Sequence, residues 1–347
     1  MYLKNIRIND KMIKDKNLNN KLVSLMNRSK LTDLYSLLKS NVESFAAILV
    51  YHRVGIFQDK WSISTIAVLE FEKQMKYLQK TYNILDLEEL VSLIKEKKAI
   101  PKKTVVITFD DGYLDNYTFA FPILKKYKIP ATIFLTTGYV GSNKIFWWDK
   151  LGYIIFNTKI EKINLKDFGE IYPKSIRQSI QSFESFIEKF KNIPEEKRKD
   201  LIEELLNSTN VTIPKQIVKD TILSWDQVKE MAENGIKFGA HTVNHPILTQ
   251  ISMKNAENEI VNSKKDIEKH INEPVRTFCY PNGLSTDFNN EIKNLLEEND
   301  FSCALTLIPK MVTLNSDLFE LGRIPPGEDF HTFKYCLSGL YSDISQG

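Results

Sequence analysis

Short apolar runs alternate with helical patterns along most of this chain of 347 residues and 40.3 kDa. The runs are rich in β-branched and aromatic residues, and the segments between them carry apolar residues at helical spacing. Strands are expected at about residues 46–51, 104–109, 131–135, 236–240, 277–280 and 301–305. Helices are expected at about residues 70–82, 87–98, 115–128, 226–234, 253–270 and 289–299. This alternation favours parallel βα units with right-handed crossovers, and one barrel-like α/β domain can reach this length.

Two adjacent carboxylates stand at the end of the second expected strand, in Thr108-Phe109-Asp110-Asp111-Gly112. Unpaired negative charge is costly to bury, so this pair indicates a bound cation or a proton-transfer role. A strand-ending turn is the alternative, because Asp and Gly are common in turns for conformational reasons. In barrels of parallel βα units, chemistry gathers at the carboxyl ends of the strands. Asp110 and Asp111 are therefore candidate site residues.

Three of the five histidines also follow expected strands. His241 and His245 come directly after the fourth strand, and His52 follows the first. Histidines four residues apart can direct both rings at one point and bind a metal ion, although a pair of polar loop residues is the alternative. His270, in a charged helical stretch, and His331, near the C-terminus, are interpreted as surface residues. The shared position at strand ends favours one site that combines the aspartates with the other three histidines.

The composition is that of an ordinary globular protein, with 42% hydrophobic and 26% charged residues. A net charge of +3 without a long basic run gives no reason to expect nucleic acid as a partner. No stretch approaches the roughly 18–20 apolar residues that a membrane-spanning helix needs. The sequence does not set an oligomeric state.

The first residues, Met1 to about Ser44, are polar and rich in Lys and Asn, with partly helical character and no hydrophobic region typical of a secretory signal. The three cysteines, Cys279, Cys303 and Cys336, are widely spaced and are expected to be buried as small hydrophobes. Both features favour a cytoplasmic location, with peripheral attachment to a membrane as a further option.

The βα alternation extends over residues 45–345 and stops between about Gly141 and Asp220. This segment is too long for a plain loop, and it carries amphipathic helical patterns at about residues 174–190 and 194–206. We interpret it as a helical insertion that could cap the site and help select substrate, with a packing appendage as an equal alternative.

The two polar motifs, in this order and each after a strand, resemble those of the polysaccharide deacetylase family, also called the NodB-homology or carbohydrate esterase 4 family. The resemblance runs from about Ile48 to Leu305, apart from the insertion. T-F-D-D-G matches the family's first motif and implies that Asp110 is the catalytic base and Asp111 a metal ligand. H-T-V-N-H matches the second motif and implies that His241 and His245 complete the metal triad. The implied fold is a distorted (β/α) barrel of the NodB type with a helical insertion.

The third family motif is altered, because this chain has F-C-Y-P-N-G at residues 278–283 where the family usually has F-R-P-P-Y-G. Cys279 stands in place of an arginine that supports the base. Arg276 or Arg323 could supply that contact instead, unless they are surface arginines. By its position in the motif, Asn282 would offer its backbone N–H to the oxyanion.

Four aromatic or apolar residues near the motifs are candidates for lining the substrate site. The resemblance implies this for Tyr280 and Pro281 of the third motif. Tyr113 follows the first motif, and Trp225 lies in Ser224-Trp225-Asp226. A packed aromatic is the slightly favoured alternative for Tyr113, and a helix start with Ser224 as N-cap is the favoured alternative for Trp225.

The family's final motif, L-x-[IL]-H near the C-terminus, is absent. In the branch that includes poly-β-1,6-N-acetylglucosamine deacetylases, an equivalent histidine lies near the N-terminus, and Val50-Tyr51-His52-Arg53-Val54 is similar to that version. The resemblance therefore implies that His52 is the general acid.

The resemblance as a whole implies a metal-dependent hydrolase that uses a divalent cation, with Zn²⁺ favoured over Co²⁺, Ni²⁺ or Mn²⁺. It would release acetate from an N-acetylated sugar in a glycan, or in a lipid- or nucleotide-linked precursor, as part of cell-surface polysaccharide biosynthesis. A deformylase or amidase acting on another acyl group or acceptor is the first alternative. A non-catalytic carbohydrate-binding protein, suggested by Cys279, is the second.

Overall fold

The computed structural model describes residue 35 and residues 44–55, 65–165, 168–173, 175–327 and 329–346. The expected N-terminal segment 1–44 thus lies almost entirely outside the described residues. The chain divides into two compact units. We call Ser142–Ile222 the insertion unit, and we call the described residues of 44–55, 66–141 and 223–346 the barrel unit.

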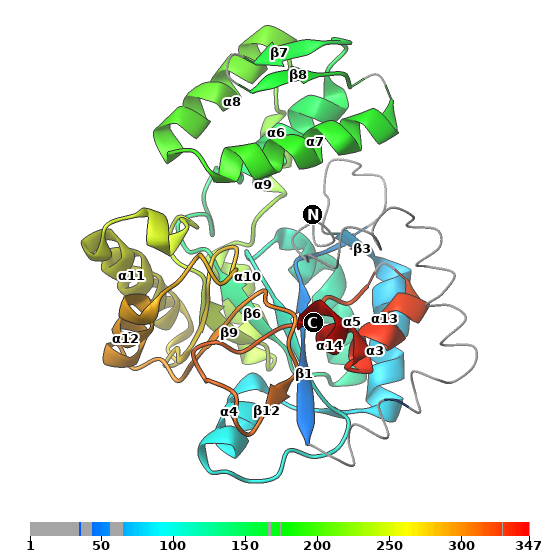
Figure 1. The fold of residues 1–347 in the computed structure, drawn as a ribbon, viewed down its shortest axis with the longest axis vertical. Coiled ribbons are helices and arrows are strands. Elements are labelled where there is room, and N and C mark those ends of the chain that lie inside the picture. The colour runs from blue at the N-terminus through cyan, green and yellow to red at the C-terminus, as the bar shows by residue number, and fades with distance from the viewer. Residues whose placement is uncertain are drawn as a thin grey trace. The chain divides into compact units, whose positions relative to one another are not determined.

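The barrel unit is built on one curled sheet with the strand order β11-β10-β9-β6-β5-β1-β12 (Figure 1). Its strands are β1 (Phe45–Tyr51), β4 (Asn83–Ile84), β5 (Thr104–Phe109), β6 (Thr132–Leu135), β9 (Lys237–Ala240), β10 (Thr277–Cys279), β11 (Cys303–Leu305) and β12 (Val312–Thr313). Neighbours from β11 to β1 are parallel, β4 adds a parallel pairing to β5, and only β12 runs antiparallel, to β1. Every residue of β1 and β5 is buried, as expected for parallel strands covered on both faces. The α/β barrel expected from the alternation is confirmed.

The segment Leu321–Ile324 bridges β11, at one end of the curled sheet, to β1, the last strand but one at the other end. Leu321 forms an isolated parallel bridge with Leu305 of β11, and Ile324 forms one with Leu49 of β1. The backbone N–H of Ile324 donates to the carbonyl of Ile48 at 2.8 Å. This closing segment has no apolar run of its own, and it brings Arg323 into the buried interior of the barrel unit.

Helices connect the parallel strands and cover the sheet (Figure 1). They are α3 (Val68–Thr81), α4 (Leu87–Lys95), α5 (Phe121–Tyr127), α10 (Trp225–Glu233), α11 (Met253–Ile271), α12 (Asn290–Glu298), α13 (Phe330–Leu337) and α14 (Leu340–Gln346). Several begin at side-chain caps, and Ser224 and Gln227 form a reciprocal capping box at the start of α10. Apolar residues of α4 pack with β1, β5, β6, β10 and β11 in one buried core. The smaller elements are β2 (Arg53–Gly55), β3 (Thr65–Ala67) and a short 3₁₀ turn, η2 (Leu248–Gln250).

The prediction of a single helix at residues 115–128 is wrong in one respect. The structure has a π-helix, η1 (Asn116–Ala120), followed by α5. Pro122 lies in the first turn of α5 and has no N–H to donate to the preceding turn. The N–H of Phe121 instead reaches back to the carbonyl of Asn116, which gives the wider turn.

The insertion unit contains α6 (Trp147–Asn157), the antiparallel pair β7 (Ile163–Leu165) and β8 (Gly169–Ile171), α7 (Ile176–Lys191), α8 (Glu195–Thr209) and α9 (Lys215–Lys219). It has its own core of buried aliphatic and phenylalanine side chains. The two helical patterns in the sequence correspond to α7 and α8, whereas α6, α9 and the β7–β8 pair were not predicted. That this unit caps the site and selects substrate stays a prediction.

Two further expectations concern membrane-spanning helices and the cysteines. In the part of the chain that the structure describes, no helix combines the length and hydropathy needed to cross a membrane. The three cysteines are free and buried, as the sequence predicts.

Candidate active site

The two aspartates of the first motif lie in a tight turn at the carboxyl end of β5. The backbone N–H of Asp110 still donates to Tyr51 of β1 at 3.0 Å, so this residue continues the sheet. Asp111 and Gly112 then both adopt φ of +75°, which is uncommon for a residue with a side chain. A Cβ on Gly112 would also lie 2.7 Å from Cδ2 of Leu135. Such backbone strain is typical of functional sites, and here it separates the directions of the two carboxylates.

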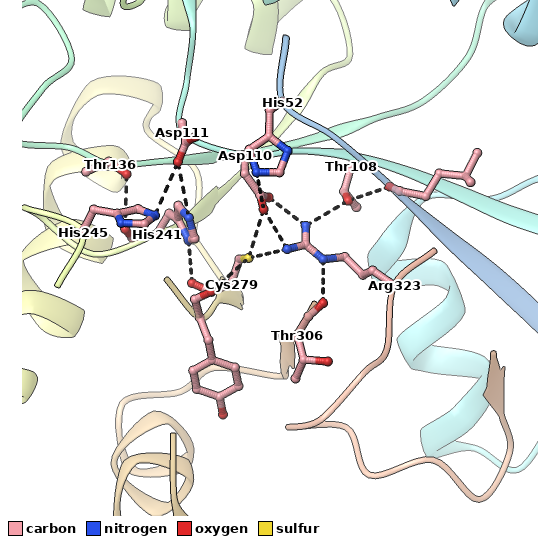
Figure 2. Close-up of polar contacts among 12 residues, drawn as sticks. His52, Thr108, Asp110, Asp111, Thr136, His241, His245, Cys279, Thr306 and Arg323 are labelled. Atoms are coloured by element: carbon pink, nitrogen blue, oxygen red, sulfur yellow. Dashed lines mark hydrogen bonds and ion pairs between the residues drawn. The ribbon is translucent and has the colours of Figure 1, made fainter. Parts of the chain in front are cut away.

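His241 is fixed in the tautomer that a metal ligand requires. It follows β9, and its backbone N–H donates to Leu135 at 3.0 Å. Its Nδ1 lies 2.7 Å from the carbonyl oxygen of Cys279, and because a carbonyl can only accept, Nδ1 carries the proton. Nε2 therefore presents its lone pair, toward Asp111 (Figure 2). A backbone carbonyl in this role is a common way to orient a metal-binding imidazole.

Asp111 and His241, both buried, and the partly buried His245 form a cluster that fits a metal ion. Nε2 of each histidine lies 3.5 Å from Oδ1 of Asp111. Two ligands of a tetrahedral zinc ion, each at ~2.0–2.1 Å from it, are themselves about 3.3 Å apart, so these separations suit a shared cation better than direct hydrogen bonds. Burial lowers the pKa of both imidazoles, which keeps them in the neutral form that binds metal.

A second cluster, Asp110 with His241 and Cys279, also brings possible ligand atoms together. It fits a cation poorly, because Arg323 already places a positive charge against two of its members. Nη2 of Arg323 lies 2.7 Å from Asp110 Oδ2 and 2.9 Å from Cys279 Sγ. Burial raises the pKa of the Cys279 thiol well above its ordinary value, so the sulfur stays protonated and is a weak ligand.

Arg323 holds Asp110 through a bidentate ion pair (Figure 2). Nη1 and Nη2 each donate to one carboxylate oxygen at 2.7 Å, while Nε donates to the carbonyl of Thr306 at 2.9 Å. Burial alone would raise the pKa of Asp110, but the adjacent guanidinium outweighs it and lowers the pKa below its ordinary value. Arg276, the other candidate, lies exposed just before β10. Of the two arginines weighed from the sequence, Arg323 is the one beside the carboxylate.

His52 lies close to Asp110, with Nε2 at 3.9 Å from Oδ2. Burial lowers the pKa of His52 to about 4, although the charge of Asp110 acts in the opposite direction. Its backbone is held from η1, since Asn116 Nδ2 donates to the His52 carbonyl at 2.8 Å. Asp115 holds the next residues, accepting from Arg53 Nε at 2.6 Å and from the Val54 N–H at 3.1 Å.

The remaining candidates take mostly packing positions. Tyr280 is buried, donates to the carbonyl of Phe319 at 3.0 Å and stacks on Phe288. Tyr113 is buried beneath the Arg53 guanidinium.

Trp225 stacks on His270 at 4.0 Å and begins α10, as its structural alternative predicts, so His270 has a packing role that its interpretation as a plain surface residue did not include. Pro281 is buried beside the site, and Asn282 follows it with φ of +58°. Asp115, Asn116 and Glu259 contact the motif segments through hydrogen bonds and had no motif signal of their own.

Residues 97–304 match the family model described as polysaccharide deacetylase, which is more than half of the chain. The chain belongs to the polysaccharide deacetylase family. A Staphylococcus aureus poly-beta-1,6-N-acetyl-D-glucosamine N-deacetylase is 25% identical over 300 residues, covering 83% of this chain and 80% of the relative.

Solved structures of this family show the same fold. IcaB from Ammonifex degensii superposes with a TM-score of 0.56 at 20% identity, over 85% of this chain and 97% of its own. The Streptococcus pyogenes deacetylase PplD, solved in complex with acetate, superposes with a TM-score of 0.54 at 21% identity, over 82% and 92%. At these identities the likeness concerns the fold alone.

Proposed function

We propose that this polysaccharide deacetylase family member is a metal-dependent N-deacetylase with Asp110 as its base. The observation that carries the proposal is that the two adjacent carboxylates of one site have different neighbours. Asp111 faces His241 and His245 at 3.5 Å, whereas Asp110 is turned away into the Arg323 guanidinium. One carboxylate is thus available as a ligand and the other as a proton acceptor.

Asp111, His241 and His245 would hold the divalent cation, with zinc favoured by two imidazoles and one carboxylate. A cation held by three protein ligands can polarise an amide carbonyl and lower the pKa of a water molecule toward ~7. The hydrogen bond from His241 to Cys279 would keep this imidazole oriented for that role.

The proton transfers fall to Asp110 and His52. The Arg323 ion pair keeps Asp110 ionised and oriented, so that it can accept a proton from the attacking water. His52 is neutral near pH 7 because burial lowers its pKa to about 4, so a resting imidazolium is not favoured. We propose that the proton taken by Asp110 passes to the leaving amine by way of His52, 3.9 Å away. One proton leaves water and one reaches the amine, so the transfers balance.

The backbone at Asn282 would provide one N–H for the developing oxyanion. Its left-handed conformation, with Gly283 following at φ of +64°, turns the chain sharply after β10. A single oxyanion donor is typically worth about 2.7–4 kcal/mol of barrier. Pro281, Tyr280, Tyr113 and Trp225 remain predicted substrate-site residues.

The substrate we propose is an N-acetylated glycan containing glucosamine, or its precursor, in cell-surface polysaccharide biosynthesis. The support is the name of the S. aureus relative, which acts on poly-β-1,6-N-acetyl-D-glucosamine, and the acetate bound to PplD. Acetate would be the product of this chain as well.

An acetate-release assay on β-1,6-linked N-acetylglucosamine oligomers, with metal content measured in parallel, tests the proposal. We expect turnover by the zinc-loaded protein, none by Asp110→Asn with its metal retained, and loss of metal in His241→Ala. N-formylated oligomers serve as the comparison substrate. Release of formate without release of acetate, or full turnover by Asp110→Asn, would contradict the proposed function.

The cytoplasmic location expected from the sequence also stays a prediction. Fractionation of cells that produce the full chain tests it, and recovery from the culture medium or from outside the cytoplasmic membrane would be the contrary result.

A further inference from the structure

The loop that carries the second motif is strained at two positions. Thr242 has φ of +66° and His245 has φ of +62°, and neither is glycine. Left-handed conformations of residues with side chains cost free energy and persist only where surrounding contacts hold them. The loop therefore needs partners that keep His245 in place, five residues beyond the end of β9.

One set of partners comes from the segment that follows β6. The backbone N–H groups of Thr137 and Gly138 donate to the carbonyls of Thr242 and Val243, at 3.1 and 2.8 Å. A Cβ on Gly138 would lie 2.7 Å from the Val243 oxygen, so only glycine allows this approach. These bonds use the carbonyls of the loop and leave its N–H groups to other acceptors.

The N–H groups are taken by one carboxylate of α11. Oε2 of Glu259 accepts from the backbone N–H of Val243 and of Asn244, each at 2.8 Å. Oε1 accepts from the Asn244 side chain, also at 2.8 Å. Hydrogen bonds to an ionised carboxylate are among the stronger ones in proteins, and consecutive N–H groups form a natural anion-binding concavity.

The hydrogen bonds to Glu259 lie in the part of the second motif that carries His245, so they can affect the position of His245 and not that of His241. His241 is held by the sheet and by Cys279, independently of Glu259. His245 depends on the loop, and its own N–H donates to Thr242 Oγ1 at 2.9 Å. The residues that Glu259 binds lie between Thr242 and His245.

We propose that Glu259 is a positioning residue that sets His245 against Asp111 and thereby raises the affinity of the site for its metal. The proposal rests on the proposed function, because it takes Asp111, His241 and His245 as the ligands. Glu259 itself touches neither metal nor substrate in this account and acts through the backbone of the loop.

Zinc affinity of the folded, metal-free protein is the direct test, measured by competition with a chelator. Loss of an outer partner of a metal ligand typically weakens binding about 10–100-fold, and we expect Glu259→Ala to do so. Glu259→Gln keeps one oxygen for the two backbone N–H groups but removes the negative charge, and Asn244→Ala removes only the side-chain bond. The zinc affinities of both variants should fall between those of wild type and Glu259→Ala. Glu257→Ala, at an exposed position of the same helix, is the matched control and should leave affinity unchanged.

A double variant distinguishes the proposed role of Glu259 from a general contribution to folding, because only the proposed role depends on His245. In a His245→Ala background, Glu259→Ala should cause no further loss of zinc affinity, because the ligand that it positions is gone. Cobalt-loaded Glu259→Ala should also show altered absorption bands, as expected when one imidazole shifts. Equal zinc affinities of the Glu259→Ala and Glu257→Ala proteins, or additive losses in the double variant, would overturn the proposal. If Glu259→Ala fails to fold, the Glu259→Gln and Asn244→Ala proteins give the same comparison.

Failure of the underlying metal site gives a different result. If His245→Ala binds zinc as tightly as wild type, the proposed ligand set is wrong and the inference about Glu259 falls with it. If His245→Ala loses zinc while Glu259→Ala does not, only the positioning role is wrong.

Discussion

Asp110 and Arg323 form an ion pair whose side chains are 2% and 0% exposed. Removing one member of a buried pair leaves the other charge uncompensated, at a cost of about 3–5 kcal/mol. We expect Arg323→Met to lose that much folding free energy and most of its activity. The double variant R323M/D110N leaves neither charge behind, so it should recover most of the stability and none of the activity. Urea unfolding and acetate release measure the two effects.

An exposed ion pair of the same unit provides the control. Lys126 and Glu72 lie 2.6 Å apart with side chains 61% and 31% exposed, and Lys126→Met should leave the stability close to that of wild type, because exposed ion pairs contribute little. The interpretation is contradicted if Arg323→Met is as stable as the control, or if the double variant is no more stable than Arg323→Met alone.

Among the secondary-structure elements, the π-helix η1 connects the segment of the base with that of the proposed acid. Its first residue, Asn116, is fully buried and donates to the His52 carbonyl. Asn116→Ala removes that donor from a buried acceptor, which should cost about 1–3 kcal/mol. A shift of His52 by about 1 Å can lower turnover up to 100-fold, so we expect kcat to fall by about 10–100-fold with KM and metal content little changed. Steady-state kinetics and metal analysis provide the measurement.

Thr118→Ala is the matched control, because Thr118 lies on the exposed side of the same π-helix. It should leave kcat within about twofold of wild type, as surface substitutions usually change little. Equal kcat values for the two variants would show that η1 does not position His52.

For the secondary-structure elements, the local pattern of apolar residues predicts most helices and strands of the barrel unit but not their irregularities. The strand β5 is reproduced residue for residue, since a run of six residues rich in β-branched and aromatic side chains is short for a helix and typical of a buried strand. The split of the 115–128 helix depends on Pro122, and proline at a first turn is also compatible with an unbroken helix that starts there. Periodicity alone does not distinguish the two.

For the whole molecule, the limit of sequence reasoning lies in contacts between distant segments. The aspartates and histidines of the two motifs are recognisable because each follows a strand end. The partner of Asp110 could be narrowed only to Arg276 or Arg323, because Arg323 is 213 residues away and its segment is placed by isolated bridges to β1 and β11. Glu259 gives no signal, since nothing local distinguishes it from the other acidic residues of a polar helix. Such partners are fixed by tertiary structure alone.

The division into two units leads to a prediction about the complete chain. The barrel unit is continuous in space at the point of insertion, because the N–H of Gly141 donates to the carbonyl of Leu223 at 2.8 Å. Its sheet, its main core and all proposed metal ligands lie outside residues 142–222. Replacing Ser142–Ile222 by a short Gly-Ser linker should therefore leave a protein that unfolds cooperatively and binds zinc as tightly as the full chain. Circular dichroism melts and chelator competition measure both properties.

The same deletion tests what the insertion unit contributes to function. If it helps select substrate, the deletion should change the ratio of kcat/KM for long and short N-acetylglucosamine oligomers without changing zinc affinity. An unchanged ratio would support a packing appendage instead. The isolated segment 142–222 should show its own cooperative melt, because its core of buried aliphatic and phenylalanine side chains is self-contained. A deletion protein that does not fold would show that the barrel unit depends on the inserted segment, contrary to the division that the contacts describe.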